Sequence, residues 1–236
     1  MSLLVQPRRP TREWLDDPSL PLREVRNNLE DLSLLHRRWG AARTLRRWVC
    51  ERLDGLDLRD RPARVLDVGA GSGDVASRLQ KTLRARGLRA AVVALDLQWR
   101  HLRMGRAMLG AAPGALAVTS DAFRLPFEDG AFDLAVSTLF FHHFSPPENR
   151  ALLREMARVA RHGFALLDLR RHRAPALFVS LAGPVLFRSR ATVHDGLASV
   201  NQAYTVDEAL AIAKAAVPRA RARRLFPFRW LLTGGV

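Results

Sequence analysis

The chain has 236 residues and 48% of them are apolar, so it can bury a full core without disulfide or metal staples. Cys50 is the only cysteine, which excludes an intrachain disulfide and makes a cytoplasmic location the default expectation. The formal net charge of +15 invites a nucleic-acid partner. However, the arginines are scattered and lack the interleaved aromatics of a stacking platform, which favours a solvated basic surface over an acidic small molecule, a carrier protein or RNA.

The first 60 residues are expected to form a helical cap. Residues 1–20 carry three prolines and no apolar segment typical of a secretory signal. Apolar residues at helical spacing then predict helices over 22–37 and 44–53, with Gly40 as the break between them. Such helices either cover a ligand or shield one face of a sheet, and the sequence leaves both readings open.

The most informative segment is VLDVGAGSGD at 65–74, an apolar strand that stops in a glycine-rich turn and then opens a helix. Such a turn presents bare backbone and free N–H groups to a ligand. A dinucleotide fingerprint would place a third glycine where Asp74 stands. Asp67 and Asp74 flank the turn and would repel a pyrophosphate. They suit a cationic ligand without phosphate, of which S-adenosylmethionine is an example, whereas a dinucleotide is the weaker alternative.

Apolar strands and helices alternate from residue 61 onward, which indicates a doubly wound parallel sheet of the α/β class. The expected strands are 63–68, 90–96, 115–119, 132–138 and 163–169, and the expected helices are 73–86, 98–109 and 147–161.

An insertion over about 172–203 follows the fifth strand. Its apolar run at 174–187 contains two prolines and is shorter than the roughly 20 residues of a membrane-spanning helix. Thr205 and Glu208 form a capping-box pattern that starts a helix reaching to about 216. Closing strands are expected near 221–226 and 228–233.

Four ordered segments carry a family resemblance. Residues 65–76 resemble motif I of the class I S-adenosylmethionine-dependent methyltransferases, and 91–96 resemble the family's second strand with its terminal acidic residue. Residues 120–127 resemble the adenine-side segment, and 132–144 resemble the fourth strand and following turn of the branch that holds quinone-biosynthesis methyltransferases. The match is good over roughly 62–170.

The resemblance implies a Rossmann-like seven-stranded sheet whose last strand is antiparallel. The whole chain, 1–236, would be one methyltransferase domain with a cap at 1–60, a cofactor-binding core at 61–171, and a substrate-side insertion with closing strands at 172–236. The implied cofactor is S-adenosyl-L-methionine, which leaves as S-adenosyl-L-homocysteine.

The resemblance also assigns cofactor contacts residue by residue. The motif I backbone would hold the methionine portion, Asp96 would accept from the ribose hydroxyls, Leu97 would pack on adenine, and Asp121 would accept from the adenine amino group. The full expected set is Asp67, Gly69, Ala70, Gly71, Gly73, Asp96, Leu97, Asp121, Ala122 and Ser137.

Methyl transfer needs proximity, alignment and a deprotonated nucleophile. Histidine is the base whose ordinary pKa suits a hydroxyl acceptor, and His142, His143 and His194 are the candidates. The bland alternative for the double histidine is a structural turn. No metal is expected, because the histidines lack ligand spacing and no magnesium-type acidic cluster is evident.

The acceptor is expected to be a small aromatic or apolar molecule of secondary metabolism, bound against Phe140, Phe141, Phe144 and the 176–187 run. O-methylation of a phenolic or polyketide-type hydroxyl ranks first, since residues 14–40 also resemble methyltransferases encoded beside type III polyketide synthases. C-methylation of a quinone or related ring ranks second. An RNA methyltransferase and a non-catalytic cofactor-binding protein are the further alternatives, and the oligomeric state is open.

Overall fold

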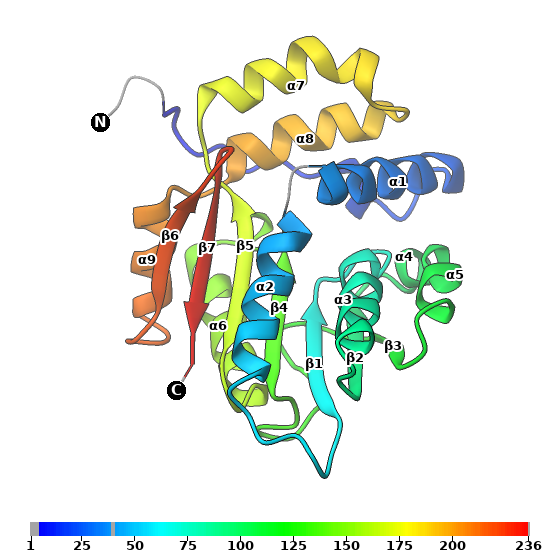
Figure 1. Ribbon diagram of the computed structural model, residues 1–236. Helices are drawn as coiled ribbons and strands as arrows, with labels where there is room; N and C mark the ends of the chain where they lie inside the picture. Colours follow the sequence, from blue (N-terminus) through cyan, green and yellow to red (C-terminus); the bar gives the residue numbers. More distant parts are fainter. Residues whose placement is uncertain (1–4, 39–40, 236) are drawn as a thin grey trace.

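The computed structural model describes residues 5–38 and 41–235, so the expected break at Gly40 lies outside the described residues. A seven-stranded sheet in the order β3-β2-β1-β4-β5-β7-β6 forms its centre (Figure 1). The strands are β1 (Ala63–Val68), β2 (Ala90–Asp96), β3 (Ala115–Thr119), β4 (Leu134–Thr138), β5 (Phe164–Leu169), β6 (Arg221–Leu225) and β7 (Arg229–Gly234). β7 runs antiparallel to both of its neighbours. The predicted α/β fold is confirmed.

The central strands are apolar on both faces, as expected for parallel strands covered by helices on each side. On one face, α2 (Ala41–Leu53), α3 (Asp74–Ala85), α4 (Trp99–Met104) and α5 (Arg106–Gly110) form one buried cluster with the sheet. On the other face, α6 (Pro146–Val159) and α9 (Val206–Lys214) form the second. Alternate residues of β1 supply the two clusters, with Val65 in the first and Leu66 in the second.

One predicted helix is in fact two. The sequence pattern predicts a continuous helix over 98–109, whereas the structure breaks it into α4 and α5 at Gly105. The Gly105 backbone lies so close to the Ser72 carbonyl that no side chain would fit between them. This contact brings the α4–α5 junction against the glycine-rich turn after β1, so the helix is interrupted where it packs against that turn.

The remaining elements lie above the carboxyl ends of the parallel strands (Figure 1). They are the 3-10 turn η1 (Trp14–Asp16), α1 (Leu22–Arg38), α7 (Arg173–Leu186) and α8 (Arg190–Gln202). Each of the two expected roles is therefore taken by one amino-terminal helix. α1 covers the strand ends, and α2 shields a face of the sheet. Among the described residues, no helix is long and apolar enough to cross a membrane.

Candidate active site

A cavity of about 820 Å³ opens at the carboxyl ends of the strands, where ligands of open parallel sheets sit. Its floor comes from the turns after β1, β2 and β3, and its walls and roof come from the turn after β4 and from η1, α1, α7 and α8. Most of the predicted cofactor residues line it: Asp67, Gly69, Ala70, Gly71, Asp96, Leu97, Asp121 and Ala122. The fold therefore gathers side chains from three separate sequence segments into one space.

The glycine-rich turn gains its shape from contacts that only glycine permits. Gly69 has a φ of +68°, and the Phe140 ring occupies the position that a Cβ atom would need. Gly73 has a φ of +73°, and a Cβ there would meet the Leu109 side chain. Gly73 does not line the cavity, so it acts by letting α3 begin close to α5.

Asp67 at the end of β1 is fully buried, and its Oδ2 atom has no hydrogen-bond partner among the described residues. Burial raises the pKa of Asp67 to about 8, the charges of Asp74 and Asp96 add to the rise, and the Ala76 N–H only partly offsets it. Asp74, by contrast, accepts from the Arg78 guanidinium at 2.7 Å. A buried carboxyl with one unpartnered oxygen at a cavity wall fits a ligand that brings a cation to it.

Asp96 at the end of β2 organises the turn as well as the cavity wall. Its Oδ2 accepts from the Gly71 N–H at 2.7 Å and its Oδ1 from the Gln98 N–H at 2.8 Å. Nearby, the Asp121 carboxylate accepts from the Phe123 N–H at 2.8 Å and lines the cavity. Both residues therefore line the cavity, and their ribose and adenine roles stay predictions.

Ser137, which is expected to contact the cofactor, lies within the sheet. Its buried hydroxyl donates to the Val68 carbonyl at 2.8 Å, across the β4–β1 pair, and it does not line the cavity. Leu139, two residues on, lines the cavity with a φ of +53°, a conformation that is strained for a side chain of this kind. At the end of β4, the Ser137 hydroxyl is thus used within the sheet, and Leu139 forms part of the cavity wall.

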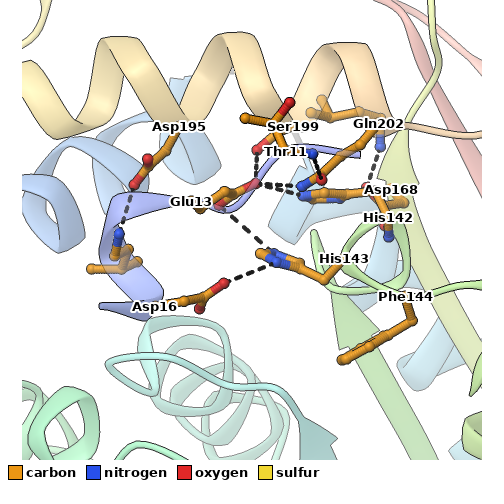
Figure 2. Close-up of polar contacts among 12 residues, drawn as sticks. Thr11, Glu13, Asp16, His142, His143, Phe144, Asp168, Asp195, Ser199 and Gln202 are labelled. Carbon is orange, nitrogen blue, oxygen red and sulfur yellow. Dashed lines mark hydrogen bonds and ion pairs between the residues drawn. The ribbon is translucent and has the colours of Figure 1, made fainter. Parts of the chain in front are cut away.

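His142 and His143 line the cavity and take part in a network of polar contacts (Figure 2). His142 Nδ1 lies 2.6 Å from Asp168 Oδ1, and its backbone N–H donates to Asp168 Oδ2 at 3.0 Å. His142 Nε2 lies 3.4 Å from Glu13 Oε1. Burial alone would lower the pKa of His142, but Asp168 and Glu13 together raise it to about 10. His142 is therefore a fixed cation at neutral pH and not a free base.

His143 is the accessible member of the pair. It stacks on His142 with ring centroids 4.4 Å apart, remains partly exposed and lines the cavity. Its Nδ1 lies 3.4 Å from Asp16 Oδ2, and its Nε2 lies 3.8 Å from Glu13 Oε2. Burial alone would raise the pKa of Glu13, but His143 and His142 lower it to about 2, so its carboxylate stays charged.

His194 does not reach the cavity. Its ring stacks on Trp14 with centroids 4.2 Å apart, and its Nδ1 lies 2.9 Å from Asp195 Oδ1. The cavity wall at this point is Asp195, whose carboxylate accepts from the Trp14 and Leu15 N–H groups at 2.7 and 3.0 Å. His194 is therefore not among the residues that line the cavity, because its ring lies between Trp14 of η1 and Asp195 of α8, and its role as a base stays a prediction.

Sequence reasoning missed Glu13, Asp16, Asp168 and Asp195. Asp168 sits at the carboxyl end of β5, where the rule that selected Asp67 and Asp96 would also have selected it. Glu13 lies in a segment without periodicity, and no sequence signal singles it out. It also accepts from Ser199 Oγ at 2.6 Å and Gln202 Nε2 at 2.9 Å, so its position depends on α8 (Figure 2).

Ligand atoms of Glu13, His142 and His143 lie within 4.8 Å of one another, a spacing compatible with a metal ion. A metal bound there would need ring nitrogens of His142 and His143 that carry no proton. Of the three aromatics expected in the acceptor pocket, Phe140 and Phe144 line the cavity. Phe141 instead packs in the core against Tyr204 and Trp230.

Comparisons with known proteins show which proteins this chain is similar to. A family model described as a methyltransferase domain matches residues 65–163. Over 128 residues the chain is 36% identical to a ubiquinone/menaquinone biosynthesis C-methyltransferase UbiE of Rhizobium johnstonii, covering 52% of this chain and 48% of that one. Over 80 residues it is 44% identical to a malonyl-[acyl-carrier protein] O-methyltransferase of Geobacter sulfurreducens, covering 34% and 28%. The chain thus spans about half or less of the curated relatives it matches.

Among solved structures, the plantazolicin methyltransferase BpumL, in complex with a substrate analogue and S-adenosylhomocysteine, superposes with a TM-score of 0.67 at 15% identity. That match covers 94% of this chain and 93% of that one. A putative O-methyltransferase from Nostoc punctiforme superposes with a TM-score of 0.64 at 16% identity, covering 97% and 64%. At these identities the superpositions show that the fold is shared.

Proposed function

We propose that this chain, whose core is a class I S-adenosylmethionine-dependent methyltransferase domain, methylates a hydroxyl group of a small, apolar, phenolic acceptor. The proposal rests on one observation, which is that a single cavity is lined by two different surfaces. The acid-edged glycine turn forms its floor, and an apolar wall from the β4 turn, α1 and α7 faces that floor.

The residues on the floor fit the methyl donor. The unpartnered Oδ2 atom of Asp67 would accept from an ammonium group, and Asp96 and Asp121, which line the same cavity, would accept from the ribose hydroxyls and the adenine amino group. When bound, S-adenosylmethionine supplies a methyl group on a cationic sulfur, which leaves as a neutral thioether and needs no protonation. The chain must therefore orient the acceptor and remove its proton.

His143 is the proposed base. It faces the cavity, is partly exposed, and has Asp16 and Glu13 to hold it in place and to stabilise the imidazolium that forms when it accepts a proton. His142 is a positioning residue, because its ring is clamped between Asp168 and Glu13 and its face supports His143. Phe140 and Phe144 offer aromatic walls for a planar acceptor.

C-methylation of a quinone-type ring is the second candidate, favoured by the relatives named as quinone-biosynthesis C-methyltransferases. Deprotonation of a phenol creates electron density on the oxygen and on the ortho ring carbons alike. The same base therefore serves either outcome, and the acceptor's orientation against Phe140 and Phe144 would decide between them.

Two measurements test the proposal. Calorimetric titration should detect binding of S-adenosylhomocysteine and no binding of NAD. An isotope-labelled methyl donor should then transfer its label to members of a panel of alkylphenols and hydroquinones, and mass spectrometry should locate the methyl group on oxygen. Label on ring carbon would select the second candidate. Transfer only to RNA, or donor binding without turnover on any phenol or hydroquinone, would overturn the proposal.

A further inference from the structure

The outer face of α7 is an exposed apolar stripe. Leu177, Leu181 and Val185 recur at four-residue spacing and are 61%, 72% and 87% exposed. Phe178 and Leu186 flank them and are exposed as well. No charged residue interrupts the helix after Arg173. An exposed apolar stripe of this length on a helix marks a contact surface.

The opposite face of α7 belongs to the cavity. Val179 packs against Gly196 and Gly183 against Val193, which docks the helix on α8. Pro175, Phe178 and Val179 line the cavity roof. Figure 1 shows α7 as the outermost helix, with α8 between it and the body of the protein. Because residues of α7 line the cavity directly, the cavity and the exposed apolar stripe lie on two sides of the same helix.

Arginines and a second apolar group surround the stripe. Arg173 lies at the start of α7, and Arg188 and Arg190 follow its end, all exposed. Arg188 also pairs with Glu30 of α1 at 3.0 Å. The β6–β7 turn lies beside the start of α7, because the Phe228 and His172 rings are 4.8 Å apart. That turn holds Phe226, which is 95% exposed.

An anionic lipid surface has the chemistry that such a stripe would bind. Apolar side chains on one helix face together with cationic groups at its rim are the two signals that hold a protein on an anionic lipid surface. The stripe lies on α7, which has 14 residues and is about 21 Å long. A helix of this length is too short to span a membrane but long enough to lie along its interface. A second copy of the chain fits less well, because it would bring two arginine rims together on molecules that each carry +15.

We propose that α7 and Phe226 dock on an anionic lipid membrane, with the apolar stripe among the acyl chains and the rim arginines at the phosphates. This inference rests on the proposed function for its consequence, which is that the acceptor is a lipophilic phenol that enters the cavity past α7 from the membrane. The docking itself requires no catalysis.

Vesicle sedimentation tests the docking with the full chain. The wild type should bind vesicles of phosphatidylcholine with one quarter phosphatidylglycerol, and binding should weaken as salt rises. Leu181→Ser with Val185→Ser should weaken vesicle binding at least tenfold without changing Tm or the Kd for S-adenosylhomocysteine. Leu116→Ser, on the exposed edge strand β3, is the matched control and should leave binding unchanged. Arg173→Gln with Arg190→Gln should remove the preference for anionic vesicles, and Arg84→Gln should not.

Kinetics test the consequence separately. The α7 double variant should raise the KM for a long-chain alkylphenol in vesicles and leave the KM for a short, water-soluble phenol unchanged. Vesicle binding without any methyl transfer would refute the proposed function and leave the docking standing. Absent vesicle binding, or equal loss in the Leu116 control, would overturn the docking. Concentration-dependent dimerisation or capture of a protein partner, abolished by the double variant, would assign the stripe to that partner and would also overturn it.

Discussion

Binding of S-adenosylhomocysteine should release a proton from Asp67. The free carboxyl has a pKa raised to about 8 by burial, so about 0.9 of the molecules carry the proton at pH 7. An ammonium group brought against the unpartnered Oδ2 atom favours the carboxylate and should lower that pKa well below 7. Complex formation at pH 7 should therefore release about 0.9 proton.

Linkage converts this release into a pH dependence. With a free pKa of about 8 and a much lower value in the complex, the association constant should rise about ninefold between pH 6 and pH 7. Over this range the ligand's own ammonium group stays protonated, so the slope reports the protein. Calorimetry in two buffers of different ionisation enthalpy measures the proton count, and the Kd series measures the slope.

Asp67→Asn provides the matched control. The amide oxygen can still accept from the Ala76 N–H, but the side chain neither titrates nor carries charge. The variant should bind S-adenosylhomocysteine more weakly at pH 7, by about 1.5–3 kcal/mol, because the ammonium loses a charged acceptor. Its Kd should also depend much less on pH. A flat wild-type profile, or an unchanged slope in the variant, would refute the assignment of Asp67 to the ammonium.

The remaining predictions concern Asp96 and the two histidines. Asp96→Ala should weaken S-adenosylhomocysteine binding by about 1–3 kcal/mol, measured by calorimetry, since the ribose and the Gly71 N–H both lose an acceptor; unchanged affinity would remove the ribose role. His143→Gln should lower kcat at least tenfold with little effect on cofactor Kd, and a wild-type rate would exclude it as the base. His142 has a folded-state pKa above its ordinary value of 6.5, so the stability it contributes is fully present below pH 6.5 and is lost as pH rises through about 10. Wild-type Tm should therefore fall over that range, and it should fall less in Asp168→Asn, which weakens the hold on the proton; equal slopes would contradict this account.

The sheet could be predicted from the sequence because its strands carry their own signals. The bounds expected for the first three strands agree with β1, β2 and β3, since each is a short apolar run closed by a glycine or a polar residue. The cofactor side followed from the same strands, because the residues after each carboxyl end meet at one edge of a parallel sheet. The break at Gly105 was not predictable, because it arises from contact with Ser72, more than thirty positions earlier.

The roles of the candidate histidines could not be predicted for a similar reason. Whether a histidine is a base depends on its neighbours in space, and those of His142 come from β5 and from a segment before the first helix. The same holds for His194, whose ring contacts Asp195 and Trp14, and Trp14 is 180 positions away in the sequence. Ser137 stands at the expected strand end, yet its hydroxyl is used within the sheet.

The amino-terminal segment closes the cavity by contacts that reach across nearly the whole chain. Arg8 donates to the carbonyls of His142, Phe144 and Gln202, and Arg171 donates to the Gln6 carbonyl. The cavity wall is thus assembled from residues that are far apart in the sequence, with Glu13 and Asp16 on one side and Asp195 and Ser199 on the other. A change in this segment would alter the wall of the cavity without touching the strands and the glycine-rich turn that form its floor.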